Sequence, residues 1–142
     1  MRVSEVMTKR VHTVPATLPA WEAWEVMRRR RIHHLVVMEH GDIAGVLSDA
    51  DAGGPCGGNM RAGTTVGHLM TPHVAGAAPT ETVGAAARRM QSLRTECLLV
   101  LSRGRLVGIV TLTDLLKVLA EQTPAAAARP PARPPHRMDR AR

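Results

Sequence analysis

The stretch Gly108-Ile109-Val110-Thr111-Leu112-Thr113-Asp114 has the pattern of a buried strand that leads into a helix. The apolar residues at 106, 107, 109 and 110 form a nearly unbroken run, which indicates a short strand covered on both faces. Hydroxyl and carboxylate side chains then precede apolar residues at helical spacing, and these polar types are good helix caps. Taken alone, the stretch predicts a strand followed by a capped helix.

The same pattern occurs 63 residues earlier, as Gly45-Val46-Leu47-Ser48-Asp49-Ala50-Asp51. Other features recur at the same spacing: Met7-Thr8 and Met70-Thr71, Met27 and Met90, Gly41 and Gly104. A helix cap has no reason to recur at a fixed offset, whereas a duplicated unit does. The sequence therefore predicts two related repeats.

Each repeat is expected to contain a turn of helix, a short extended segment, a helix, two buried strands and a second helix. The central helices are predicted at about Pro19 to Arg30 and Thr80 to Leu93, and the strands after them at 34–38 and 97–101. After Asp114 a helix is expected to about Ala120. The Gly-rich residues 52–59 are instead interpreted as a flexible linker, because glycine and proline disfavour a helix.

The predicted fold class is α+β, with two β-α-β-β-α repeats packed about a pseudo-twofold, since neither repeat is large enough to bury a good core alone. The first repeat is expected to occupy residues 1–59, with the linker from about residue 52, and the second residues 60–121. Residues 122–142 are predicted to be a disordered tail rich in Pro, Ala and Arg.

Composition narrows the classes of function. The chain lacks Phe and Tyr, so it has no aromatic platform for single-stranded nucleic acid. Of its net charge of +7, residues 1–120 carry +4 (14 Lys/Arg, 10 Asp/Glu) and residues 121–142 carry +3 (5 Lys/Arg, 2 Asp/Glu). Two cysteines make no disulfide framework, and no apolar run suits a signal peptide or a membrane span. A cytoplasmic protein without membrane contact is the default expectation.

The tandem pattern resembles a pair of cystathionine-beta-synthase (CBS) domains, also called a Bateman module. The resemblance covers about residues 2–120 and rests on the two Gly-to-Asp stretches, the two Met-Thr openings and Arg31-Ile-His-His-Leu-Val-Val37. It implies a regulatory module that binds AMP, ADP, ATP or S-adenosylmethionine between the repeats and transmits its occupancy to a protein partner. It also implies a homodimer.

The resemblance further implies roles for individual residues. Asp51 and Asp114 would hold ribose hydroxyls, because a carboxylate can accept from both hydroxyls of a cis-diol. Ser48 and Thr111 would hydrogen-bond near the ribose-phosphate without adding negative charge. The base would lie near the aliphatic segments that contain Thr13, Val14, Leu35 and Val36.

His33 and His34 stand where similar segments of the family place a basic pair against phosphates. An alternative stays open, in which they are two strand-entry histidines on opposite faces and one is merely packed. The second repeat has Glu96 and Cys97 at these places, and Glu96 would repel a phosphate. The two sites are therefore expected to be unequal.

No nucleophile-base set or paired acid and base suggests an enzyme. No i, i+4 histidine pair or His/carboxylate cluster suggests a metal site. One alternative function is a ligand-free dimerisation or interaction scaffold of the same fold, favoured by the lost helix after Asp51. A lower-ranked alternative is a nucleic-acid-binding protein that uses Arg28–Arg31 and the basic tail.

Overall fold

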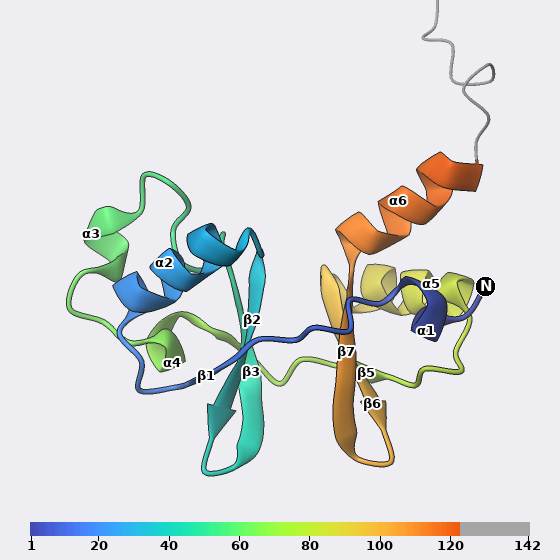
Figure 1. The fold of residues 1–142 in the computed structure, drawn as a ribbon, viewed down its shortest axis with the longest axis horizontal. Helices are drawn as coiled ribbons and strands as arrows, with labels where there is room; N and C mark the ends of the chain where they lie inside the picture. The colour runs from blue at the N-terminus through green and yellow to red at the C-terminus, as the bar shows by residue number, and fades with distance from the viewer. Residues whose placement is uncertain (123–142) are drawn as a thin grey trace, which may run out of the picture.

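The structure is a computed structural model that describes residues 1–122 of the 142-residue chain. Two small sheets stand beside each other, with helices on their outer sides (Figure 1). The first sheet has the order β1 (Thr13–Pro15), β2 (His34–Glu39), β3 (Asp42–Ser48), β4 (Thr71–Pro72), and the second the order β5 (Gly76–Ala77), β6 (Cys97–Ser102), β7 (Arg105–Thr111). The predicted α+β class with two related halves is confirmed. The predicted disordered tail lies, except for Gln122, outside the described residues.

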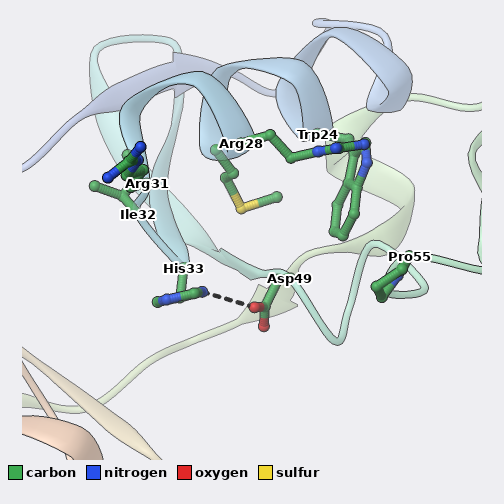
Figure 2. A pocket seen from close by; sticks show the side chains of 8 residues that line it. Trp24, Arg28, Arg31, Ile32, His33, Asp49 and Pro55 are labelled. Carbon is green, nitrogen blue, oxygen red and sulfur yellow. Dashed lines mark hydrogen bonds and ion pairs between the residues drawn. The ribbon is translucent and has the colours of Figure 1, made fainter.

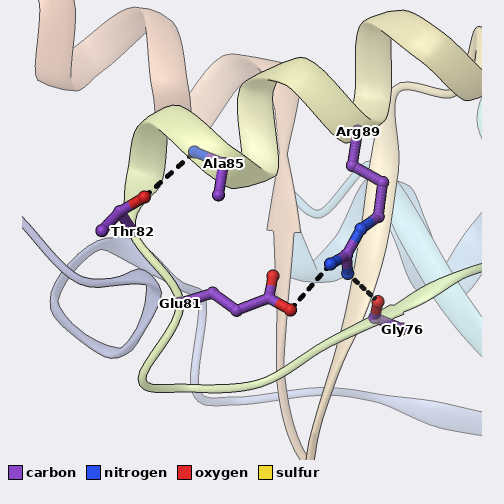
Figure 3. Close-up of polar contacts among 5 residues, drawn as sticks. All are labelled: Gly76, Glu81, Thr82, Ala85 and Arg89. Carbon is purple, nitrogen blue, oxygen red and sulfur yellow. Dashed lines mark hydrogen bonds and ion pairs between the residues drawn. The ribbon is translucent and has the colours of Figure 1, made fainter.

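Three long helices accompany the sheets: α2 (Ala20–Arg30), α5 (Val83–Leu93) and α6 (Leu112–Gln122). Three single-turn helices are α1 (Val3–Val6), α3 (Gly58–Arg61) and α4 (Val66–Leu69). The predicted central helices are present, but the second begins three residues later than expected. Its start is set by Thr82, whose hydroxyl oxygen accepts the backbone N–H of Ala85 at 3.1 Å (Figure 3).

The two hairpins match each other in detail. β2 pairs antiparallel with β3, and β6 pairs antiparallel with β7. Their two-residue turns, His40-Gly41 and Arg103-Gly104, have positive φ at both positions, as a type I′ turn requires. The register shifts once in each hairpin, between residues 37 and 38 and between residues 100 and 101, which are 63 apart. The duplication predicted from the sequence thus extends to the irregularities of the strands.

The opening segment of each repeat packs on the other half of the molecule. The Val3 N–H donates to the Glu81 carbonyl at 2.8 Å, so α1 joins the helices beside the second sheet. The Val66 N–H donates to the Leu18 carbonyl at 2.9 Å, and β4 pairs with β3. We therefore call residues 13–72 the first lobe, and we call residues 1–8 together with residues 75–122 the second lobe.

An ion pair supports the entry to α5. Arg89 donates to the Glu81 carboxylate at 2.8 Å and also to the Gly76 carbonyl, so one side chain joins α5, β5 and the segment between them (Figure 3). The other carboxylate oxygen of Glu81 is buried without a hydrogen-bond partner. The Glu81 carbonyl also accepts the Val3 N–H, so this group of contacts connects α1 to α5 and β5.

The lobes pack together through an aliphatic cluster. Val36 and Val46 from the first sheet contact residues of the second sheet in a buried group that also contains Cys97, Leu99 and Ile109. Separate clusters lie between each sheet and its helices. The apolar contact between lobes agrees with the expectation that neither repeat buries enough surface alone.

The glycines that begin the two motifs are needed for close approach, not for an unusual φ. A Cβ at Gly45 would overlap the carbonyl oxygen of Thr71, in strand β4, which pairs with β3. A Cβ at Gly108 would lie 2.6 Å from the Met7 sulfur and 3.0 Å from the Thr8 carbonyl oxygen. The atoms that a Cβ would meet belong to the opening segments of the repeats, Met7-Thr8 and Thr71. The two glycines therefore allow each opening segment to pack against the other half of the molecule.

We predict that Gly45→Ala lowers the free energy of unfolding by about 1–3 kcal/mol, because the backbone of Thr71 cannot yield as a flexible side chain could. Urea unfolding followed by circular dichroism measures this. Gly58→Ala is the control, since a Cβ there meets nothing within 4 Å. Equal midpoints for Gly45→Ala and the unmodified chain would contradict the role given to the crossing.

Candidate functional site

The polar residues of each motif hold one another at the end of a strand. The Thr111 N–H and hydroxyl donate to Asp114 Oδ2 at 2.9 and 3.1 Å, and the Asp114 N–H donates back to the Thr111 hydroxyl oxygen at 3.3 Å. Ser48 and Asp51 exchange the same two backbone bonds, at 3.0 and 2.9 Å. Both pairs form a reciprocal cap of the capping-box kind. Helix α6 follows the cap at Thr111, whereas only turns follow the cap at Ser48.

Each cap opens into a cleft between the lobes. The Asp114 cleft, of about 240 Å³, is bordered by Thr111 and Asp114 of the second lobe and by His33, His34 and Val36 of the first. The Asp51 cleft, of about 230 Å³, combines residues of both lobes in the same way: Ser48, Asp51, Thr71, Arg94, Glu96 and Cys97. The clefts are therefore equal in size and equivalent in construction.

The structure pairs the functional groups of the two repeats crosswise. The sequence grouped the histidine pair with Asp51 of its own repeat, and Glu96-Cys97 with Asp114. In the structure His33 lies in the Asp114 cleft, His34 borders both clefts, and Glu96 and Cys97 lie in the Asp51 cleft. The reason is that the lobes face each other, so each cap meets the strand entrance of the opposite lobe.

The crosswise pairing concentrates positive charge in the Asp114 cleft. Its permanent cations are Arg10, Arg31 and Lys117, and its carboxylate is Asp114, which gives +2 with neutral histidines. The Asp51 cleft has one permanent cation, Arg94, and two carboxylates, Asp51 and Glu96, which gives −1 with neutral histidine. The clefts, of about 240 and 230 Å³, thus differ clearly in charge.

His34 borders both clefts at the start of β2. Its burial lowers its pKa below the ordinary histidine value, and the neighbouring His33 acts in the same direction. The carboxylates of Asp49, Asp51 and Glu96 oppose this shift. The half-buried ring of His34 therefore borders both clefts, and a change in its protonation alters the electrostatic potential in both.

His33 is the more exposed histidine, with 74% of its side chain accessible. Its Nδ1 lies 2.9 Å from Asp49 Oδ2, which orients the ring at the mouth of the Asp114 cleft. Both histidines border the Asp114 cleft, where His34 is partly packed and His33 is accessible. Their contact with a phosphate stays a prediction.

The Asp51 cleft has little basic character. Asp51 Oδ2 accepts from the Thr71 hydroxyl at 3.1 Å in addition to its cap bonds. Burial first, and then Asp51 and Glu96, raise the pKa of Cys97 to about 11, against a smaller effect of its hydrogen bond with Thr95. The thiol is therefore neutral near pH 7.

Three of the four residues assigned to the base, Thr13, Val14 and Leu35, lie outside both clefts. Val14 is 5% exposed and packs in the core between the first sheet and its helices. Thr13 lies on an exposed position of β1 and borders a different depression, near the hairpin turns. Leu35 is fully buried in the same core as Val14. Alternation along the strands explains the burial of Val14 and Leu35, because neighbouring residues face opposite sides of a sheet.

Sequence reasoning missed several residues of the Asp114 cleft: Arg10, His12, Thr113 and Lys117. Lys117 had a usable signal, since it follows Asp114 by three positions and so shares its helix face. Arg10 and His12 had none, because the crossing of the opening segment between lobes brings them to the cleft.

Residues 1–122 contain no group of three His, Cys, Asp or Glu side chains placed to hold a metal ion. None of the helices described for this stretch is both long and apolar enough to cross a bilayer.

We predict that the free energy of unfolding falls more steeply below about pH 6.5 for the unmodified chain than for His34→Gln. A histidine with a lowered pKa binds its proton more weakly in the folded state, so its contribution is complete above the unfolded pKa. As the pH falls through 6.5, the unfolded chain takes up the proton first and stability is lost. Urea unfolding at pH 7.5 and 5.5 measures the difference, and identical pH dependence of the two proteins would contradict it.

We predict that iodoacetamide labels Cys56 much faster than Cys97 at pH 7.5. Cys56 is exposed, whereas Cys97 is buried and has a pKa of about 11, so roughly one Cys97 in 3,000 is a thiolate at this pH. Mass spectrometry of tryptic peptides gives both rates, and labelling in urea shows the rates without the fold. Comparable rates in the native protein would show that the Cys97 thiol is not buried with a raised pKa.

The comparisons with known proteins agree with this architecture. A family model for the CBS domain matches residues 3–52 and 66–121. The CBS domain-containing protein YhcV of Bacillus subtilis is 29% identical over 114 residues, which cover 80% of this chain and 81% of that protein. A signal-transduction protein with CBS domains from Burkholderia ambifaria has a similar structure, with a TM-score of 0.76, 26% identity, and coverage of 87% of this chain and 97% of that one.

A ligand-bound structure is also similar. The CBS domain pair of protein MJ0100, solved with 5′-methylthioadenosine and S-adenosyl-L-methionine, has a TM-score of 0.75 and 25% identity, and covers 87% of this chain and 98% of that one. The matched regions contain both Gly-to-Asp motifs and both caps. With two family matches that together span most of the described residues, the chain belongs to the CBS domain family.

Proposed function

We propose that the protein is a regulatory module that binds a phosphate-bearing adenine nucleotide in the Asp114 cleft. The observation that carries the proposal is the difference in charge between two clefts of nearly equal volume. A nucleotide phosphate needs cations or N–H and O–H donors around it. Of the two clefts, the one at Asp114 has the excess of cations.

The arrangement suggests how each part of the ligand is held. The ribose hydroxyls would meet Asp114, whose cap bonds all use Oδ2 among the described residues, so Oδ1 can accept from the ligand. The Thr111 hydroxyl and the histidine pair lie along the same cleft. Arg10, Arg31 and Lys117 would neutralise the phosphate. The base would contact Ile109, Val36 and Val11, which takes the place of the earlier assignment to Thr13 and Val14.

The Asp51 cleft favours a different member of the same ligand class. Asp51 and Glu96 would repel a phosphate and attract a cation, while the ribose recognition of the cap is retained. A neutral or cationic adenosyl compound, such as methylthioadenosine or S-adenosylmethionine, suits these charges. MJ0100, whose CBS pair was solved with both compounds, supports the choice of class.

The regulatory part of the proposal follows from where the clefts lie. Each cleft takes residues from both lobes, so a bound ligand contacts both sides of the lobe interface. A ligand shifts a conformational equilibrium when it binds two arrangements unequally. We propose that occupancy is passed in this way to a protein partner, and that the chain forms a homodimer. The exposed Leu116 on α6 offers one apolar contact for such a neighbour.

We predict that calorimetry detects binding of AMP, ADP or ATP and that Asp114→Asn weakens it about 10- to 100-fold. A charged hydrogen bond contributes about 1.5–3 kcal/mol. Asparagine keeps an oxygen that can accept the Thr111 N–H, so the cap of α6 is retained. Asp51→Asn is the matched control, since it makes the same change in the other cleft.

Titrations with S-adenosylmethionine and a short DNA duplex complete the experiment. Equal loss of nucleotide affinity in both variants would contradict the assignment to the Asp114 cleft. Absence of heat with every adenosyl compound would favour the ligand-free scaffold. Binding of the duplex that survives both substitutions and disappears on deletion of residues 123–142 would favour the nucleic-acid alternative.

A further inference from the structure

A third cavity lies in the first lobe, outside the two clefts. It has a volume of about 450 Å³ and lies between α2 and the turns that follow Ser48 (Figure 2). Trp24 and Arg28 of α2 form one wall, and Asp49 and Pro55 form the opposite wall. We call this cavity the Trp24 pocket. Arg31, Ile32 and His33 separate it from the Asp114 cleft, which they also border.

The pocket exists because the first repeat has lost a helix. In the second lobe α6 packs on α5, and its Val118 is 8% exposed. The counterpart of Val118, 63 residues earlier, is Pro55, which lies in an exposed turn. The chain leaves the helical path at Gly53 and Gly54, which have φ of 92° and 66°. The side chains that would cover this part of α2 are therefore absent.

Arg61 keeps the space open by holding the turns. It is only 7% exposed, and its Nη1 donates to the carbonyls of Ala52 and Gly54 at 2.8 and 2.6 Å. Its guanidinium also lies 4.2 Å from the centre of the Trp24 ring. The Gly-rich segment predicted as a linker is thus anchored by hydrogen-bonded turns and a buried cation.

The lining of the Trp24 pocket is apolar with a basic edge. Trp24, Met27, Ile32 and Pro55 supply apolar surface, and Met27 is 2% exposed. Arg28 and Arg31 supply positive charge, and neither makes an ion pair within residues 1–122. The single carboxylate, Asp49, already contacts His33. Such a site matches a ligand with an apolar body and a negative group.

We propose that the Trp24 pocket is a further ligand site, which takes a small organic anion with an apolar or aromatic body. The apolar body would lie against Trp24 and Met27, and the anionic group would meet Arg28 and Arg31. The volume falls within the usual range of small-molecule pockets, about 300–1,000 Å³. The proposal does not rest on nucleotide binding, because Trp24, Arg28 and Pro55 border neither of the two clefts, although Arg31 borders both this pocket and the Asp114 cleft.

The composition of the chain provides a direct readout. Trp21 and Trp24 are its only aromatic residues of the Phe, Trp and Tyr types, and Trp21 is 56% exposed on the same helix. A Trp21→Phe background therefore leaves Trp24 as the sole tryptophan. The probe is 8-anilinonaphthalene-1-sulfonate, an aromatic anion that accepts energy from tryptophan. N-phenyl-1-naphthylamine has the same rings without the sulfonate and serves as the neutral probe.

The expected result is saturable energy transfer from Trp24 to bound 8-anilinonaphthalene-1-sulfonate. The protein should bind this anionic probe about tenfold more tightly than the neutral probe. Arg28→Gln, which introduces the residue found at the equivalent position 91, should remove most of this preference. Two controls change charge by the same amount elsewhere: Arg29→Gln on the same helix, and Lys117→Gln in the Asp114 cleft. Both should leave the preference intact.

Three results would overturn the proposal. One is absence of energy transfer from Trp24 while each variant keeps the circular dichroism of the unmodified chain. The second is equal affinity for both probes, which would mean an apolar patch without recognition of the anion. The third is equal weakening by Arg28→Gln and either control, which would mean that the probe responds to overall charge or occupies the Asp114 cleft.

Discussion

The crossing of two backbone segments over two glycines governs the architecture of this protein. At Gly45 a Cβ would overlap the Thr71 carbonyl oxygen, and at Gly108 a Cβ would lie 2.6 Å from the Met7 sulfur and 3.0 Å from the Thr8 carbonyl oxygen. These crossings place α1 beside the second sheet and β4 at the edge of the first. Each lobe is then completed by a piece of the other, and the aliphatic cluster that contains Val36 and Ile109 closes the interface. The clefts are a consequence of this packing, because they lie where each cap meets the opposite lobe.

Duplication followed by divergence has given the two clefts different electrostatics. The caps are nearly identical, and the volumes differ by about 10 Å³. The differences lie at the strand entrances, where His33-His34 in one repeat correspond to Glu96-Cys97 in the other. His34 belongs to both clefts, and its lowered pKa reflects burial at their boundary. A charge bound in one cleft therefore acts on a group that also borders the other.

Much of the fold could be predicted from the residues. The 63-residue period located both repeats, and the apolar patterns located α2, α5 and the strands of both hairpins. The start of α5 lies three residues later than the apolar pattern predicts, because Thr82 caps the helix. The Gly-rich segment was correctly predicted to lack a long helix, but its last two residues, Gly58 and Asn59, begin the single-turn helix α3, and its anchored turns were not predicted. The anchoring depends on Arg61, whose contacts with Ala52 and Trp24 are set by the packing around them.

Two different kinds of information thus describe the site. The residues along the chain predicted two matching motifs, one ending in Ser48–Asp51 and the other in Thr111–Asp114, with a basic strand entrance in one repeat and an acidic one in the other. Those features depend on local spacing, which is readable along the chain. The packing of the lobes is what brings the basic entrance to Asp114 and the acidic one to Asp51. The physical reason is that cleft partners come from lobes packed face to face, so residues far apart in the chain become neighbours while residues of one repeat are separated.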